Sequence, residues 1–157
     1  MKGFGKDATV DVRSENVISR PRLVLAAFAS DPDNAPLWYA NIKSVEWRTP
    51  KVLVVGSRIA FVANFLGRAL KYTYEITDLI PGERLVMQTA EGPFPMETSY
   101  TWTTASGDRT QMTLRNRGTP RGFMSLAAPF MAGAVRRVNR KDLAKLQRVL
   151  EGVDQHR

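Results

Sequence analysis

Cysteine is absent from the 157 residues, and the single histidine, His156, is the second-to-last residue. The lack of cysteine excludes disulfides, thiolate metal sites and cysteine nucleophiles. One histidine at the end of the sequence leaves neither a histidine-based catalytic triad nor a multi-histidine metal site in the body of the chain. We therefore expect no metal, flavin or nicotinamide cofactor.

Long hydrophobic runs are also missing. No apolar stretch is long enough to cross a membrane, and Met1 to Asp7 lacks the apolar segment of a secretory signal. These two absences predict a cytoplasmic protein. No glycine-rich phosphate loop is present either, because the glycines at 56, 67, 82 and 92 stand singly at turns.

Acidic residues are the minority charge: 23 Lys and Arg stand against 15 Asp and Glu, a net charge of +8. Such a balance raises the possibility of a nucleic-acid partner or of an anionic membrane surface. The cations are spread along the chain, with one denser group from Arg136 to Lys145, and no nucleic-acid-binding motif accompanies them. We therefore expect no specific nucleic-acid partner. Whether the basic group has another partner stays open.

The last fifth of the chain, from Pro120 to Gly152, predicts one long helix. Pro120 suits the first helical position, whereas Pro129 predicts a kink near Phe130. The apolar stripe is either ordinary core or, in its first half, the roof of a cavity. Its members recur at helical spacing: Phe123, Ala127, Phe130, Ala134, Val138, Leu146 and Val149.

The start of the chain predicts one strand and two short helices. The strand spans Thr9 to Ile18, and Ser19 with Pro21 then marks the start of the first helix. Asp31-Pro32 begins the second helix in the same way. The buried side of the first helix is expected to comprise Leu23, Val24, Ala27 and Phe28.

Between residues 42 and 118, alternating apolar and polar residues predict six strands separated by turn signals such as Pro81-Gly82 and Ser106-Gly107-Asp108. Tight turns favour antiparallel pairing of neighbours. One apolar face indicates a sheet covered on one side, by the long helix. Glu75, Glu97 and Arg115 fall on the opposite, solvated face.

Several short motifs occur in an order that resembles one protein family. They are Val17-Ile18-Ser19-Arg20-Pro21, Asp31-Pro32 with Trp38, Phe65-Leu66-Gly67-Arg68, Tyr74-Glu75-Ile76-Thr77, Pro81-Gly82-Glu83-Arg84-Leu85 and Asp142-Leu143-Ala144-Lys145-Leu146. Over nearly its whole length the sequence is similar to the START-like (SRPBCC, helix-grip) superfamily, in particular to polyketide cyclase/dehydrase-type members.

The resemblance implies an α+β helix-grip fold: a strand, two short helices and a six-strand meander wrapped around a long C-terminal helix. It implies a single domain over residues 1–157, with flexible ends at 1–8 and 153–157. A hydrophobic cavity is expected between sheet and helix. The family includes binders, transporters and cyclases, and it offers no invariant catalytic set to transfer, so catalytic residues are unknown. The branch with a Rieske centre requires cysteines and is excluded.

Strand parity predicts which side chains line this cavity, and hydroxyls and amides among them are expected to orient a ligand. Such a pocket usually encloses about 300–1,000 Å³. The predicted ligand-binding residues are Ile59, Phe61, Phe65, Tyr72, Tyr74, Met87, Met96, Thr98, Tyr100, Trp102, Met112, Leu114, Asn116, Phe123, Ala127, Phe130, Met131 and Ala134.

Three hypotheses about function follow. The first is binding of a small hydrophobic ligand, such as a lipid, a polyketide-like aromatic or an isoprenoid. The second is an enzyme of cyclase/dehydratase type that uses pocket tyrosines, with Tyr72 and Tyr100 as the preferred donors. The third is an interaction protein with a filled cavity, for example a homodimer.

Overall fold

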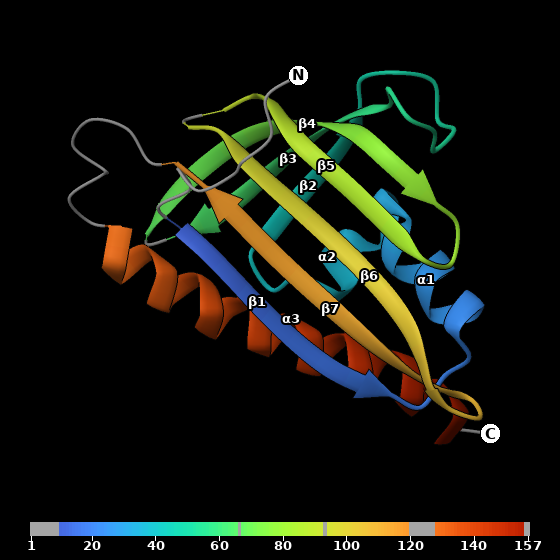
Figure 1. The fold of residues 1–157 in the computed structure, drawn as a ribbon. Coiled ribbons are helices and arrows are strands. Elements are labelled where there is room, and N and C mark those ends of the chain that lie inside the picture. Colours follow the sequence, from blue (N-terminus) through green and yellow to red (C-terminus); the bar gives the residue numbers. More distant parts are fainter. Residues whose placement is uncertain (1–9, 66, 93, 120–127, 156–157) are drawn as a thin grey trace.

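The computed structural model describes residues 10–65, 67–92, 94–119 and 128–155. It contains a seven-stranded antiparallel sheet in the order β1-β7-β6-β5-β4-β3-β2 (Figure 1). The strands are β1 (Val10–Ile18), β2 (Ile42–Trp47), β3 (Arg58–Phe65), β4 (Arg68–Ile80), β5 (Arg84–Glu91), β6 (Met96–Ser106) and β7 (Arg109–Gly118). The helices are α1 (Arg22–Ser30), η1 (Pro32–Asn34), α2 (Ala35–Trp38) and α3 (Ala128–Gln155).

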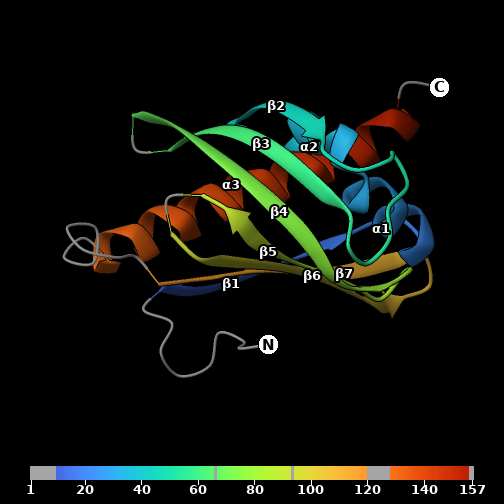
Figure 2. The ribbon, with the colours of Figure 1, turned by 90° about the horizontal axis from the view of Figure 1, so that it is seen from above.

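The sheet curves around α3, which confirms the predicted helix-grip architecture. Figure 2 shows β2 and β3 on one side of α3 and β1 and β7 on the other, with α1 and α2 towards one end. Strands β2 to β7 form a meander, and β1 adds to the far edge by pairing Val10 with Gly118. A strongly twisted sheet of this kind encloses its concave face, and α3 covers that face.

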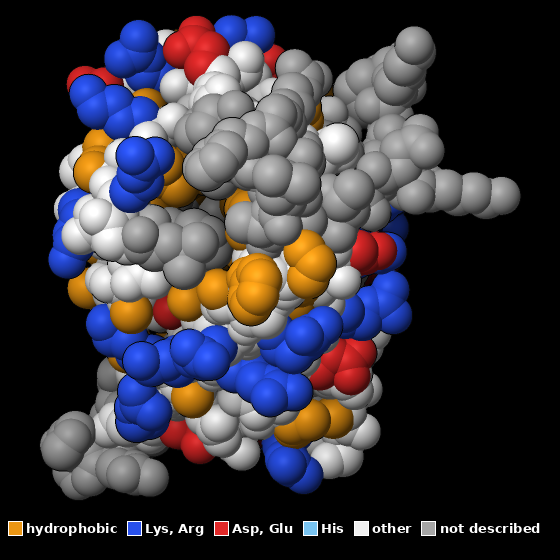
Figure 3. Space-filling view, turned by 90° about the vertical axis from the view of Figure 1, so that its left-hand side faces the viewer, with side chains coloured by type: hydrophobic (Ala, Val, Ile, Leu, Met, Phe, Trp, Pro, Cys, Tyr) orange, Lys and Arg blue, Asp and Glu red, His pale blue; other side chains and the backbone are white. Residues whose placement is uncertain are grey.

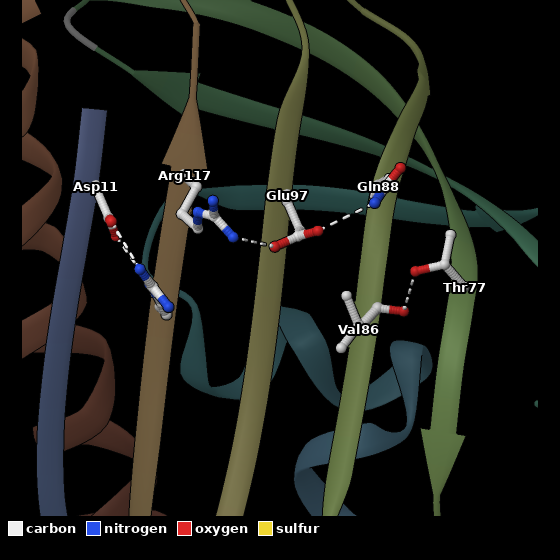
Figure 4. A network of polar contacts seen from close by, with 7 residues as sticks. Asp11, Thr77, Val86, Gln88, Glu97 and Arg117 are labelled. Atoms are coloured by element: carbon white, nitrogen blue, oxygen red, sulfur yellow. Dashed lines mark hydrogen bonds and ion pairs between the residues drawn. The ribbon is translucent and has the colours of Figure 1, made fainter. Parts of the chain in front are cut away.

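Polar side chains hold neighbouring strands together on the convex face (Figure 4). Arg115 of β7 donates to both carboxylate oxygens of Asp11 on β1, at 2.8 and 2.7 Å. Glu97 of β6 accepts from Arg117 at 3.3 Å and from Gln88 at 3.0 Å. Glu97 and Arg115 thus lie on the predicted face, but Glu97 is paired and its side chain is only 15% exposed.

The buried face of α1 differs from the prediction. Leu23 is 65% exposed and Val24 42% exposed, whereas Leu25, Ala26 and Ala29 are buried. Because α1 is apolar from Leu23 to Ala29, its sequence permits more than one buried face, and packing against β6 and β7 decides between them.

The predicted caps of the two short helices have different outcomes. The Ser19 side chain does not cap α1: the helix begins after Pro21 without a side-chain cap bond, and the Ser19 N–H donates to Glu151. The prediction for Asp31 is confirmed, since its carboxylate accepts the Asp33 N–H at 3.0 Å.

Helix α3 is described from Ala128, so the predicted start at Pro120 lies outside the described residues. Pro129 is the second residue of the described part of α3. The buried face comprises Met131, Val135, Asn139, Asp142, Leu143, Leu146 and Leu150. Two contacts attach the second half of α3 to the sheet edge: Asn16 of β1 donates to Gln147 at 2.9 Å, and the Ser19 N–H to Glu151 at 2.7 Å.

Candidate functional site

A cavity of about 160 Å³ lies between the concave face of the sheet, the first half of α3, and α1 with α2. Its lining is mostly apolar. Ten of the predicted residues lie on its wall: Ile59, Phe61, Tyr72, Tyr74, Met87, Met96, Thr98, Tyr100, Asn116 and Met131. The volume is below the predicted range, because Tyr72, Tyr74, Tyr100 and three methionines fill much of the concave face.

Other predicted residues lie elsewhere. Trp102, Met112 and Leu114 occupy the same face of the sheet but are packed in the core with Leu143 and Leu146, at 2% exposure or less. The structure therefore does not bring them to the cavity, because the second half of α3 covers that end of the sheet.

The residues of α3 that were predicted to line the cavity also differ from the prediction. Phe130 is 81% exposed, which corrects its expected inward orientation, and Ala134 is not on the cavity wall. Met131 and Val135, each one position further along, face the sheet instead. Phe123 and Ala127 lie outside the described residues, as does the side chain of Phe65.

A row of side-chain hydrogen bonds runs along the wall from α3 through β7 to β6. Asn139 donates to Oδ1 of Asn116 at 2.7 Å, and Asn116 donates to the Thr98 hydroxyl oxygen at 2.8 Å. Burial raises the pKa of the nearby Tyr74 hydroxyl, and the Thr98 side chain acts in the opposite direction. No acceptor for the Tyr74 O–H is found among the described residues, so this group is available to donate into the cavity. Asn139 is not among the residues predicted from the sequence, although its position on the apolar side of α3 indicates this face.

Asp142 of α3 is the one carboxylate on the cavity wall that is completely buried, at 0% exposure. Its Oδ1 accepts the Ala40 N–H at 3.0 Å, while Oδ2 has no partner among the described residues. Burial raises the pKa of Asp142 from 3.8 to about 6, with the Ala40 hydrogen bond acting in the opposite direction. Asp142 is part of a motif that resembles the family but is not among the predicted ligand-binding residues. Its helical spacing to Met131, Val135 and Val138 indicates the cavity face.

Two further tyrosines line the cavity close to Asp142. The hydroxyls of Tyr39 and Tyr100 lie 2.5 Å apart, and Tyr39 was not among the predicted residues. Burial raises the pKa of both, and the negative charge of Asp142 adds to the effect. Both hydroxyls are therefore protonated at neutral pH. One of them donates to the other, which leaves one O–H for a ligand.

The site thus offers apolar walls, donors from tyrosines and one unused acceptor, Asp142 Oδ2. Within the described ranges, no group of three or more His, Cys, Asp or Glu side chains is placed to hold a metal ion. In the same part of the chain, no helix combines the length and the hydrophobicity needed to cross a bilayer. The arrangement suits an apolar molecule with a hydroxyl or carbonyl group.

Comparison with known proteins agrees with this geometry. The family model "Polyketide cyclase / dehydrase and lipid transport" matches residues 9–151. The structure of TTHA0849 from Thermus thermophilus superposes with a TM-score of 0.78 at 20% identity, covering 90% of this chain and 98% of that one. No curated protein matches the chain.

Two further solved structures share the fold. The Zhui aromatase/cyclase from Streptomyces sp. R1128 has a TM-score of 0.77 at 17% identity, covering 90% of this chain and 93% of that one. A START superfamily protein from Mycobacterium smegmatis has a TM-score of 0.68 at 14% identity, covering 94% and 99%. At these identities the similarity establishes the fold.

Proposed function

The chain belongs to the polyketide cyclase/dehydrase and lipid transport family, and from this premise we propose that it binds a small hydrophobic ligand in the cavity between the sheet and α3. The observation that supports the proposal best is the buried Asp142 Oδ2, which lies without a partner among the described residues on an otherwise apolar wall. A buried polar atom without a partner costs roughly 1–3 kcal/mol, and a ligand donor removes that cost.

The dimensions and wall residues indicate the class of ligand. An engineered apolar cavity of about 150 Å³ accommodates benzene, and the present cavity of about 160 Å³ is similar in size. One ring or a short branched chain therefore fits without rearrangement. Met87, Met96 and Met131 line the space, and flexible methionines can adjust to a larger molecule. A lipid, a polyketide-like aromatic or an isoprenoid carrying a hydroxyl group satisfies these conditions.

Native mass spectrometry of freshly purified protein tests the proposal. We expect a co-purified mass, or saturable binding of an apolar fluorescent probe. Val138→Trp should abolish either signal because Val138 lies on the cavity wall, and Ala134→Trp, one turn away and off the wall, is the matched control. Failure of the wild-type protein to bind any apolar probe would refute the proposal.

A second candidate function is a cyclase/dehydratase reaction, and Asp142 favours it. A carboxyl group with a pKa of about 6 exchanges a proton near neutral pH, as general acid–base catalysis requires. Tyr74 lines the cavity together with Tyr72 and Tyr100, the two donors of the sequence-based hypothesis, and is a third hydroxyl donor for a substrate carbonyl.

An activity assay with a poly-β-carbonyl substrate would distinguish an enzyme from a binding protein. In an enzyme, Asp142→Asn should reduce turnover by about 10²–10⁴-fold while substrate affinity changes less. In a binder, no product forms with the wild type or the variant. The interaction-protein hypothesis is disfavoured by the open volume of the cavity, and the homodimer stays a prediction for analytical ultracentrifugation.

A further inference from the structure

The exposed side of α3 carries a row of cations with no acidic neighbour on that side of the helix. Arg136, Arg137, Arg140, Lys141 and Arg148 are exposed, and none has a hydrogen-bond or ion-pair partner among the described residues. The single acidic residue between Ala128 and Arg148 is Asp142, on the buried side. Some cations on the sheet are paired instead: Arg58, Arg84 and Arg115 each form an ion pair with a carboxylate.

Phe130 stands in line with three of these cations. It is followed by Arg137, Lys141 and Arg148 at intervals of seven, four and seven residues, which places all four side chains along one line of the helix. The line is about 27 Å long. Phe130 is 81% exposed, the most exposed of the large hydrophobic side chains in the described ranges. Figure 3 looks at the side where α3 begins and shows Lys and Arg side chains gathered in a band next to hydrophobic ones.

This surface adjoins an accessible part of the cavity wall. Val138, which lies between Arg137 and Lys141 in the sequence, lines the cavity and is only half-buried. Asn64 of β3 also lines the cavity and is exposed. Parts of the cavity wall on α3 and β3 are therefore accessible, and Val138 is next to Arg137 in the sequence.

We propose that the exposed face of α3, from Phe130 to Arg148, docks the protein on an anionic phospholipid surface. Rows of Lys and Arg bind such surfaces, and an aromatic side chain among them inserts at the level of the headgroups. An acidic protein or a nucleic acid would also attract the cations. A lipid surface additionally accounts for the exposed phenylalanine. It also suits the proposed ligand, a poorly water-soluble molecule that a protein collects from or delivers to an apolar phase; this last step rests on the proposed function.

Sedimentation with vesicles at about 0.15 M salt tests the proposal. The protein should bind vesicles containing about 30% phosphatidylserine and bind pure phosphatidylcholine far less. The combined change Arg137→Gln, Lys141→Gln and Arg148→Gln should reduce partitioning on the order of 100-fold, since each cation contributes about a factor of five. The matched control neutralises three exposed cations elsewhere, Arg13→Gln, Lys43→Gln and Arg109→Gln, and should retain most of the binding.

The absence of cysteine allows a direct measurement of insertion. Phe130→Cys provides a single labelling site for a polarity-sensitive dye, and Thr104→Cys at an exposed position near the end of β6 provides the control. The dye at position 130 should shift to shorter wavelength when anionic vesicles are added, and the dye at position 104 should not. Circular dichroism confirms that each variant is folded.

Three results would overturn the proposal. The first is that the wild-type protein does not bind the anionic vesicles. The second is that the two triple variants lose vesicle binding equally. The third is that the dye at position 130 stays in water while DNA or an acidic protein displaces the vesicles completely. Native mass spectrometry reports on the cavity separately. A protein that binds vesicles but never carries a ligand would refute the proposed function and leave this inference intact.

Discussion

Replacing the buried carboxyl of Asp142 by an amide should stabilise the protein at neutral pH. Asp142 is at 0% exposure, its Oδ2 has no partner among the described residues, and its pKa of about 6 compares with 3.8 for the ordinary group. Because the folded pKa is raised, the unfolded chain gives up its proton at lower pH than the folded protein does. Ionisation therefore destabilises the fold as pH rises from about 4 to about 6.

The size of the effect follows from the shift. A difference of about two pH units corresponds to about 3 kcal/mol, which is reached above about pH 7 and shrinks to about 0.5 kcal/mol near pH 4. Asp142→Asn keeps an oxygen for the Ala40 N–H and removes the charge. Its advantage in the free energy of unfolding should therefore grow from about 0.5 to about 3 kcal/mol over this range.

Urea unfolding at a series of pH values measures this difference. Asp11→Asn is the control of opposite sign, because a hydrogen bond from Arg115 lowers the pKa of Asp11. Asp11 contributes stability above its unfolded pKa and loses that contribution as pH falls, so its replacement should destabilise the protein at neutral pH only. An Asp142→Asn variant that is less stable than the wild type at pH 7, or whose advantage does not depend on pH, would refute the reasoning.

Three further changes probe other features of the structure. Tyr74→Phe should weaken ligand binding by about 0.5–1.5 kcal/mol, the value of one hydrogen bond, while Tyr72→Phe should have a smaller effect. Titration with an apolar probe measures both affinities. Equal effects would contradict the assignment of Tyr74 as the hydrogen-bond donor. Gly82→Ala should destabilise the fold by about 1–3 kcal/mol in urea, since φ is +78° and the new Cβ would lie 2.6 Å from Leu23. Gly56→Ala should reduce the free energy of unfolding by less, because φ is +98° but the new Cβ would have no atom within 4 Å. A larger loss for Gly56→Ala than for Gly82→Ala would show that the contact with Leu23 does not matter. Leu23→Ser should change stability by less than about 0.5 kcal/mol, because Leu23 is 65% exposed, and a larger loss would mean that this side of α1 is covered.

The sheet and its share of the cavity wall could be predicted in part because strands have a period of two. Alternation in β6 separates Thr98 and Tyr100 from Glu97 and Ser99, and the structure places the first pair on the cavity wall. The alternation, however, predicts on which face of the sheet a side chain lies, and not whether its position along the strand is next to the cavity. Trp102 and Met112 share the correct face but lie beneath the second half of α3, in the core.

Helix faces were harder to assign. In α3 both Phe130 with Ala134 and Met131 with Val135 fit an apolar stripe, and only the packing of Met131 and Val135 against Val12 and Phe94 selects the second pair. In α1 nearly every residue is apolar, so the pattern does not define one face. Asp142 and Asn139 were missed because polar residues within an apolar stripe are easily read as solvated.

The pairing of β1 with β7 has a consequence for the order of events during synthesis. Val10 pairs with Gly118 and Ile18 with Thr110, so β1 finds its partner only after about a hundred further residues have been made. The hairpins from β2 to β7 connect close neighbours and can form earlier. The partly assembled sheet exposes its apolar concave face until α3, which a hydrogen bond between Asn16 and Gln147 joins to β1, packs against it. A hydrophobic molecule that is present during this stage has access to the open concave face, which β1 and α3 afterwards cover.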